Sequence, residues 1–286
     1  MIEDGLSDLV ARALAEDVGP GDVTAEAVVP ATVRTTARIV QKAPGVISGF
    51  GAAAATFEQA GAERFESLVG EGEWYDGAAR DIATVAGPAR SILAAERTAL
   101  NFLGHLSGIA TLTAQFVQAA SSGHAEILDT RKTIPGLRTL EKAAVAAGGG
   151  RNHRMGLHDA ILIKENHAAL AGGIAQAIRQ AREAQPAMPV EIEVRNAEEV
   201  QAALTEGADR LLLDNMTISG LRSAVAARDA IARDGGTRAE LEASGGVSLA
   251  TTPEISSTGV DFISVGALTH SAPALDLSLL LEGASP

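Results

Sequence analysis

Short apolar runs alternate with helical segments through the second half of the chain. The runs are EIL at 126–128, AILI at 160–163, VEIEV at 190–194, RLLL at 210–213, AELEA at 239–243 and DFISV at 261–265. Because parallel strands need a crossover helix between them, this alternation predicts βαβ units and a parallel sheet. Six runs are fewer than the eight strands of a complete α/β barrel, so we expect an open or incomplete barrel.

The first half of the chain has a different pattern. One face of a predicted amphipathic helix at its start carries the apolar residues Leu6, Leu9, Val10 and Leu14. Between residues 24 and 88, β-branched runs at 33–43 and 82–86 with glycines between them favour strands. A helical pattern then extends from 89 to about 118, and Ser107-Gly108 predicts a break in it. We place the domain junction at this break.

Polar residues and glycines stand at the ends of the six apolar runs. They are Asp129-Thr130-Arg131-Lys132, Lys164, Glu193, Asp214, Ser244-Gly245-Gly246 and Gly266-Ala267. The carboxyl ends of barrel strands converge on one face, so we expect these residues to ring one pocket. The late glycine loops fall where such barrels hold phosphate through backbone N–H groups.

Positive charge is concentrated in one segment of an acidic chain. The formal net charge is −13, yet residues 129–167 hold seven Lys and Arg and three of the six histidines. This reversal of sign predicts a small anionic ligand rather than a polyanion. Arg131 and Arg154 suit planar carboxylates, whereas Lys132 and Lys164 act as point charges, so we expect a ligand set with carboxylates and phosphates. Arg138 and Lys142 are expected to be solvated surface charges.

Composition excludes several classes of protein. The absence of cysteine excludes disulfides and thiolate metal sites and fits a reducing compartment, so we expect a cytoplasmic protein. The acidic N-terminus does not resemble a secretory signal, and no window reaches the roughly 18 apolar residues of a membrane span. A pI near 4.9 and 3% aromatic residues argue against nucleic-acid binding.

Several motifs together resemble one enzyme family. They are GDVT at 21–24, AERTALNFLGHLSGIAT at 95–111, the whole segment 129–167, EIEV at 191–194, LLLDN at 211–215, EASGGV at 242–247 and ISVGALTHS at 263–271. In this order they are similar to the quinolinate phosphoribosyltransferases, also called carboxylating nicotinate-nucleotide pyrophosphorylases. The resemblance implies an N-terminal α/β sandwich domain over 1–107, completed by 273–286, packed beside an incomplete α/β barrel catalytic domain over 108–272.

The resemblance also implies a reaction. Quinolinate and phosphoribosyl pyrophosphate would give nicotinate mononucleotide, CO₂ and pyrophosphate with Mg²⁺, as the de novo entry to NAD. Arg131, His153, Arg154 and Lys164 would bind the two ring carboxylates, and Arg97 would come from the partner subunit of a homodimer.

The same resemblance divides the remaining site residues into two groups. Lys132, Glu193 and Asp214 would act as catalytic residues around phosphoribosyl pyrophosphate, with Glu193 and Asp214 near the metal. The expected 5′-phosphate cradle and its adjoining substrate-binding residues are Thr130, Ser244, Gly245, Gly246, Val265, Gly266, Ala267 and His270.

Other interpretations stay open on the sequence. The chain could be a phosphoribosyltransferase for another pyridine carboxylate, a Schiff-base aldolase with Lys164 as nucleophile, or a non-catalytic binder of a phosphorylated metabolite. Glu193 and Asp214 could be helix N-caps, and Asp22 is expected in a turn or cap.

Overall fold

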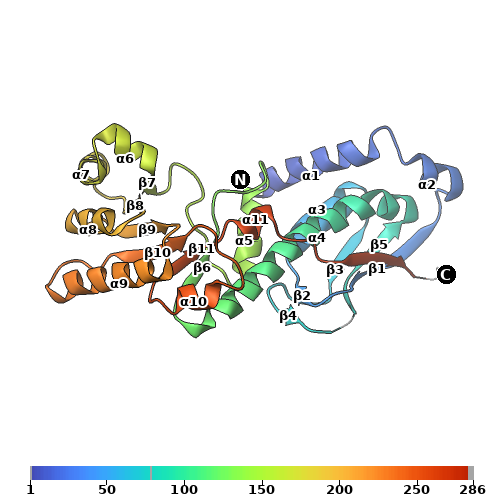
Figure 1. Ribbon diagram of the computed structural model, residues 1–286. Coiled ribbons are helices and arrows are strands. Elements are labelled where there is room, and N and C mark those ends of the chain that lie inside the picture. Colours follow the sequence, from blue (N-terminus) through green and yellow to red (C-terminus); the bar gives the residue numbers. More distant parts are fainter. Residues whose placement is uncertain (1, 78, 283–286) are drawn as a thin grey trace. The chain divides into compact units, whose positions relative to one another are not determined.

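The computed structural model describes residues 2–77 and 79–282 (Figure 1). The chain divides into two compact units, the first formed from 1–114, 135–149 and 271–286 and the second from 115–134 and 150–270. Residues 135–149, which the sequence analysis places in the barrel domain, thus belong to the first unit. The predicted domain boundaries at 107 and 272 stay a prediction.

An antiparallel sheet organises the first unit. Its strand order is β12-β1-β5-β3, with bounds β1 (Arg34–Gln41), β3 (Arg64–Ser67), β5 (Arg80–Pro88) and β12 (Leu277–Leu281). A second, small sheet pairs β2 (Gly45–Val46) with β4 (Trp74–Tyr75). Because β12 pairs with β1, a segment from the end of the chain completes the first sheet. Residues 283–286 of the predicted completing segment lie outside the described residues.

Helices supply the rest of the first unit. They are α1 (Ile2–Val18), α2 (Val23–Val28), α3 (Phe50–Gln59), α5 (Arg138–Ala147) and most of α4 (Ala89–Ala119). The expected opening helix is confirmed, but the expectation of strands throughout 24–88 is wrong at α2 and α3. The segment FGAAAATFEQ of α3 contains four consecutive alanines, the strongest helix formers, and buries Phe50 and Phe57 in the core. Asp22 caps α2 as expected, accepting hydrogen bonds from the backbone N–H groups of Thr24 and Ala25.

The expected break at Ser107-Gly108 is also wrong, because α4 continues through it. Ser107 is buried, and its hydroxyl accepts from Ser48 N at 3.1 Å and donates to Ser48 O at 3.2 Å. At Gly108, an added Cβ would lie 2.1 Å from the carbonyl oxygen of Pro273. These two small residues let other backbone segments approach the helix rather than end it.

One cation lies elsewhere than expected. Lys142 is only 1% exposed, so its expected place at the solvated surface is wrong. It lies on the buried face of α5, together with Glu141, Ala144 and Val145. The neighbouring Glu141 is buried too and lies 2.9 Å from His105 Nε2.

A six-stranded parallel sheet forms the centre of the second unit. Its order is β6-β11-β10-β9-β8-β7, with bounds β6 (Glu126–Leu128), β7 (Ile161–Ile163), β8 (Val190–Val194), β9 (Arg210–Asp214), β10 (Glu240–Ser244) and β11 (Phe262–Ser264). All six apolar runs of the sequence are strands here, and every pair is parallel. Within the described residues, β6 and β7 stand at opposite ends of the strand order, so the expected open α/β barrel is confirmed.

Helices follow most of these strands. They are α6 (Glu165–Ala171), α7 (Ile174–Ala184), α8 (Ala197–Thr205), α9 (Ile218–Arg233), α10 (Thr252–Ser256) and, after the last strand β11, α11 (Ala267–His270); the short 3₁₀ helix at Ala120–Ser122 precedes β6. Helices α7 and α8 both contact β8. Among the helices of the described residues, none has both the length and the apolar character that crossing a membrane requires.

Gly108 provides a stability test of the close approach to α4. Replacing a mid-helix glycine by alanine normally stabilises a helix by roughly 0.5–1 kcal/mol. We expect Gly108→Ala instead to lower the free energy of unfolding by about 1–3 kcal/mol, because the new methyl group meets a backbone carbonyl. Urea unfolding measures the change, and Gly51→Ala on α3, where nothing lies within 4 Å, is the matched control. A Gly108→Ala protein as stable as the original would contradict this packing.

Candidate active site

A cavity of about 300 Å³ lies within the second unit. Its lining residues are Thr130, Arg131, Lys132, His153, Arg154, Leu162, Lys164, Glu193, Leu212, Asp214, Glu242, Ser244 and Ser264. Nine of the residues proposed from the sequence therefore line one cavity, although they span more than a hundred positions of the chain.

Strand alternation explains why these side chains meet. Successive side chains of a strand point to opposite faces, so Glu193 shares a face of β8 with Glu191. In the same way Asp214 shares a face of β9 with Leu212, and parallel register places Asp214 directly beside Ser244 of β10. Neighbouring strand ends thus contribute a carboxylate and a hydroxyl to one rim.

The cationic residues of the cavity lie close to one another. Burial and the charge of Arg131 lower the pKa of Arg154, and the Arg154 guanidinium donates to the carbonyl of Ala160 at 3.2 Å. Lys132 follows Arg131 in the loop after β6. Two guanidinium groups that repel each other in a partly buried place favour binding of an anion.

Lys164 and Glu193 form an ion pair in the cavity, with Nζ 2.9 Å from Oε2. The carboxylate of Glu193 fixes the position of the Lys164 amine in the cavity.

Glu193 and Asp214 do not cap the helices that follow them. Asn196 caps α8 by accepting from Glu199 N at 2.9 Å, and Thr217 caps α9 by accepting from Gly220 N at 3.2 Å. Both carboxylates thus point to a role in the cavity rather than in capping.

The glycine loops lie beside the same strand ends. Gly245 and Gly246 have positive φ angles of 93° and 60°. A Cβ at Gly266 would lie 3.2 Å from both Lys132 Cδ and His270 Nε2, and Thr269 Oγ1 donates to Lys132 O at 2.9 Å. The loop after β11 therefore contacts the loop after β6.

Some proposed residues do not line this cavity. They are Arg97, Gly245, Gly246, Val265, Gly266, Ala267 and His270. Arg97 lies on α4 in the first unit, with its side chain 69% exposed and 3.9 Å from Glu96.

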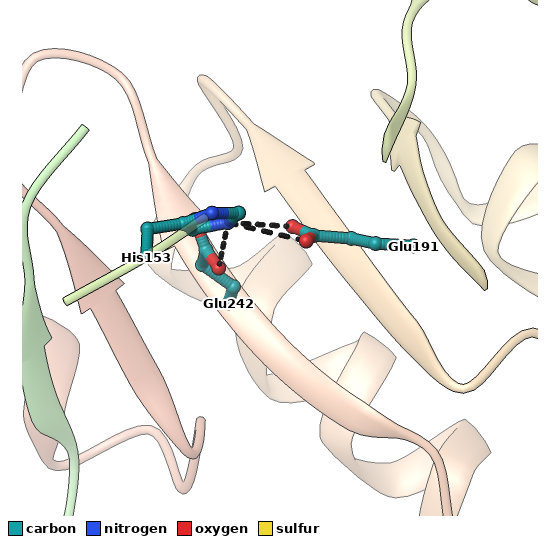
Figure 2. A group of neighbouring side chains, drawn as sticks. All are labelled: His153, Glu191 and Glu242. Carbon is teal, nitrogen blue, oxygen red and sulfur yellow. Dashed lines mark hydrogen bonds and ion pairs between the residues drawn. The ribbon is translucent and has the colours of Figure 1, made fainter. Parts of the chain in front are cut away.

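Two buried glutamates of the barrel interior were missed by the sequence analysis. Glu191 and Glu242 are 6% and 0% exposed, and Figure 2 shows both carboxylates directed at the same side of the His153 ring. Glu191 Oε2 and Glu242 Oε2 lie 3.1 Å and 3.3 Å from His153 Nε2. Arg210 Nη1 lies 3.5 Å from Glu242 Oε2. The alternation of glutamate with apolar residues in VEIEV and AELEA was the signal that pointed to inward acids.

These contacts set the protonation of the group. Burial alone would lower the pKa of His153, but its hydrogen bonds to Glu191 and Glu242 raise the pKa to about 9. Burial and the charge of Glu242 raise the pKa of Glu191. Burial acts in the same direction on Glu242, but the hydrogen bond and charge of His153 outweigh it and lower the pKa of Glu242. The backbone N–H of Arg154 donates to His153 Nδ1 at 2.7 Å, which opposes protonation of that nitrogen.

The three side chains also have the spacing of a cation site. Their ligand atoms all lie within 4.8 Å of one another. In this structure both carboxylates approach the same nitrogen, Nε2, so the N–H group of the ring lies against them.

Comparison with known proteins agrees with this geometry. Residues 22–107 match the family model described as quinolinate phosphoribosyl transferase, N-terminal domain, and residues 109–280 match the C-terminal domain of the same enzyme. The chain belongs to the quinolinate phosphoribosyltransferase family. The predicted family, function and enzyme class are therefore confirmed.

Individual relatives extend over nearly the whole chain. A carboxylating nicotinate-nucleotide pyrophosphorylase of Mycobacterium leprae is 43% identical over 96% of this chain and 97% of the relative. A chloroplastic carboxylating pyrophosphorylase of Arabidopsis thaliana is 41% identical over 97% of this chain and 83% of its own length. The solved structure of the nicotinate-nucleotide pyrophosphorylase of Francisella tularensis superposes with a TM-score of 0.90 at 40% identity, covering 98% of this chain and 96% of that one.

The His153 cluster gives a testable pH dependence. We expect His153 to lose its proton near pH 9, and earlier in Glu242→Gln, which removes one carboxylate. Because the folded-state pKa exceeds the usual 6.5, the associated stability is complete below pH 6.5. It is lost as pH rises through about 9, by about 1.4 kcal/mol per pH unit. NMR of ¹³C-histidine-labelled protein measures the midpoint, with His153→Gln assigning the signal. A midpoint below 6.5 would show that Nδ1 stays an acceptor for Arg154.

Proposed function

We propose that this chain transfers the phosphoribosyl group of phosphoribosyl pyrophosphate to the ring nitrogen of quinolinate. The products are nicotinate mononucleotide, CO₂ and pyrophosphate, at the start of NAD synthesis from quinolinate. The observation that carries the proposal is the gathering of Arg131, Arg154, Glu193 and Asp214 in one cavity of a chain of this family. The relatives' names support the same reaction.

Quinolinate binding follows from the cations of the cavity. Arg131 and Arg154 repel each other, and a dianion relieves that repulsion. Guanidinium groups form paired hydrogen bonds with carboxylates, and each charge-assisted bond contributes roughly 1.5–3 kcal/mol. A pyridine with two adjacent carboxylates uses both arginines, whereas nicotinate has a single carboxylate. The cavity thus favours quinolinate over the other pyridine carboxylates considered from the sequence.

Transfer joins the pyridine nitrogen to the anomeric carbon as the bond from that carbon to pyrophosphate breaks. Negative charge grows on the leaving pyrophosphate, and Lys132 is placed to stabilise it. The pyridine nitrogen is a weak nucleophile, so fixed orientation by the arginines supplies much of the rate. The nitrogen becomes positively charged and stabilises the electron pair left at the adjacent carbon when CO₂ departs; a proton then completes that carbon.

Glu193 and Asp214 fit the requirements of Mg²⁺. Both present carboxylate oxygens to the same cavity, and Mg²⁺ prefers oxygen ligands shared with substrate phosphates. We propose that these two residues hold the ion, directly or through water. When bound, Mg²⁺ neutralises charge on the pyrophosphate.

The loops after β10 and β11 are proposed as the 5′-phosphate cradle. Gly245 and Gly246 are exposed and Gly266 is half-buried, and their backbone N–H groups are proposed to contact the phosphate, with Ser244 and His270 as side-chain donors. Thr130, Val265 and Ala267 adjoin these contacts.

The proposed assembly is a cytoplasmic homodimer, in which the partner's copy of Arg97 reaches the neighbouring site. The exposure of Arg97 supports this proposal. No nucleic-acid or membrane partner is proposed.

Direct turnover tests the proposed reaction. Purified protein with quinolinate, phosphoribosyl pyrophosphate and Mg²⁺ should give equal amounts of nicotinate mononucleotide and CO₂, measured by chromatography and ¹⁴CO₂ release from labelled quinolinate. Nicotinate in place of quinolinate should give at least about a hundredfold less product, because two or more charged contacts are lost. Product from nicotinate alone would favour the alternative phosphoribosyltransferase.

Mixing two inactive variants tests the shared site. Arg97→Ala and Lys132→Ala homodimers should each be inactive. In a heterodimer one of the two sites regains both residues, so an equimolar mixture should recover about a quarter of the original activity. Subunit exchange is verified by native mass spectrometry. If the mixture stays inactive although exchange is verified, the proposed site shared between two subunits is wrong.

A further inference from the structure

Asn215 follows Asp214 at the end of β9 and has a left-handed backbone. Its φ is 53°, and it is the one non-glycine residue with positive φ in the described part of the chain. Glycine adopts this conformation without a steric penalty, and asparagine is one of the few other residues that adopt it, because its short side chain forms local hydrogen bonds. The contacts of the Asn215 side chain therefore carry the argument that follows.

The side chain contacts two elements of the candidate site. Asn215 Nδ2 donates to Asp214 Oδ2 at 2.9 Å. A Cβ at Gly245 would lie 2.2 Å from Asn215 Oδ1, so the amide lies directly against the Gly245 backbone. The backbone N–H of Asn215 also donates to Ser244 O at 2.8 Å. The residue thus joins the end of β9 to the loop after β10.

Helix capping does not account for Asn215. Helix α9 begins at Ile218 and is capped by Thr217, whose hydroxyl accepts from Gly220 N. The amide of Asn215 is left for Asp214 and Gly245.

We propose that Asn215 is a positioning residue for phosphoribosyl pyrophosphate. Its amide fixes the orientation of the Asp214 carboxylate, and its packing on Gly245 fixes the distance between that carboxylate and the Ser244-Gly245-Gly246 loop. Phosphoribosyl pyrophosphate can then contact the Asp214 carboxylate through its ribose hydroxyls or through a bound metal ion. Its 5′-phosphate can contact the loop at the same time. This inference rests on the proposed function for the roles of Asp214 and the loop.

The variant Asn215→Gly tests the side chain separately from the backbone conformation. Glycine tolerates the φ of 53°, so only the side-chain amide is lost. We expect a folded protein whose dissociation constant for phosphoribosyl pyrophosphate with Mg²⁺ rises about tenfold, the effect of one hydrogen bond to a charged group. The KM for that substrate should rise as well, and the KM for quinolinate should stay unchanged. Calorimetry and initial rates measure the two effects.

Two further variants make the test specific. Asn215→Asp keeps the shape of the side chain but sets a carboxylate against Asp214, so its affinity for phosphoribosyl pyrophosphate should fall further than that of Asn215→Gly. Asn196→Gly is the matched control: it removes the cap of α8 and should lower stability while leaving both affinities unchanged.

The outcomes distinguish this inference from the proposed reaction. Original affinity for phosphoribosyl pyrophosphate in Asn215→Gly overturns it, as does an equal loss of affinity for both substrates. If Asn215→Gly fails to fold, original affinity in Asn215→Asp overturns it. If the unchanged protein binds phosphoribosyl pyrophosphate but gives no product, the proposed reaction alone is overturned. The dissociation constants of the unchanged protein, Asn215→Gly and Asn215→Asp then still decide the role of Asn215.

Discussion

The parallel alignment of six strands is the constraint on which the candidate site depends. It brings the carboxyl end of every strand in the second unit to one edge of the sheet. Side chains two residues apart on a strand share a face, so the residue two positions before a strand end lies on the same face, further from that edge. On β8, Glu193 lines the cavity while Glu191 lies deeper against His153. On β10, both Ser244 and Glu242 line the cavity, and Glu242 also contacts His153. These two strands thus each place a glutamate against His153 two residues before the polar residue at the strand end.

The buried layer sets acidic and basic side chains against one another. Removing two carboxylates from water costs several kcal/mol each, and only close partners offset that penalty. Protonated His153 and Arg210 supply those partners, and Arg210 also stacks 4.2 Å from the Phe262 ring centroid. At the rim, Lys164 pairs with Glu193, and the charge of buried Glu191 acts on the guanidinium of Arg154.

The sequence predicts the second unit better than the first for a physical reason. A buried parallel strand is a short apolar run, and the polar residue ending it marks the rim, so the six strands and seven of the nine proposed cavity residues could be found from local pattern. His153 and Arg154 lie in an irregular loop and were proposed from the charge pattern and the family resemblance. The burial of Lys142, by contrast, depends on packing against other segments of the chain. The partnership of His153 with Glu191 and Glu242 joins three separate elements, and no local pattern contains it.

The contrast between an acidic chain and a cationic cavity also determines the size of ligand that binds. At physiological salt, charges more than about 8 Å apart are largely screened, so the net charge of −13 acts weakly on an anion already inside the cavity. Within that range the cavity presents the cations Arg131, Lys132, Arg154 and Lys164 beside the carboxylates of Glu193, Asp214 and Glu242. A compact anion with several charges feels mainly this field, whereas a long polyanion extends over the acidic surface and is repelled there. The charge pattern therefore selects small, highly charged substrates by their dimensions.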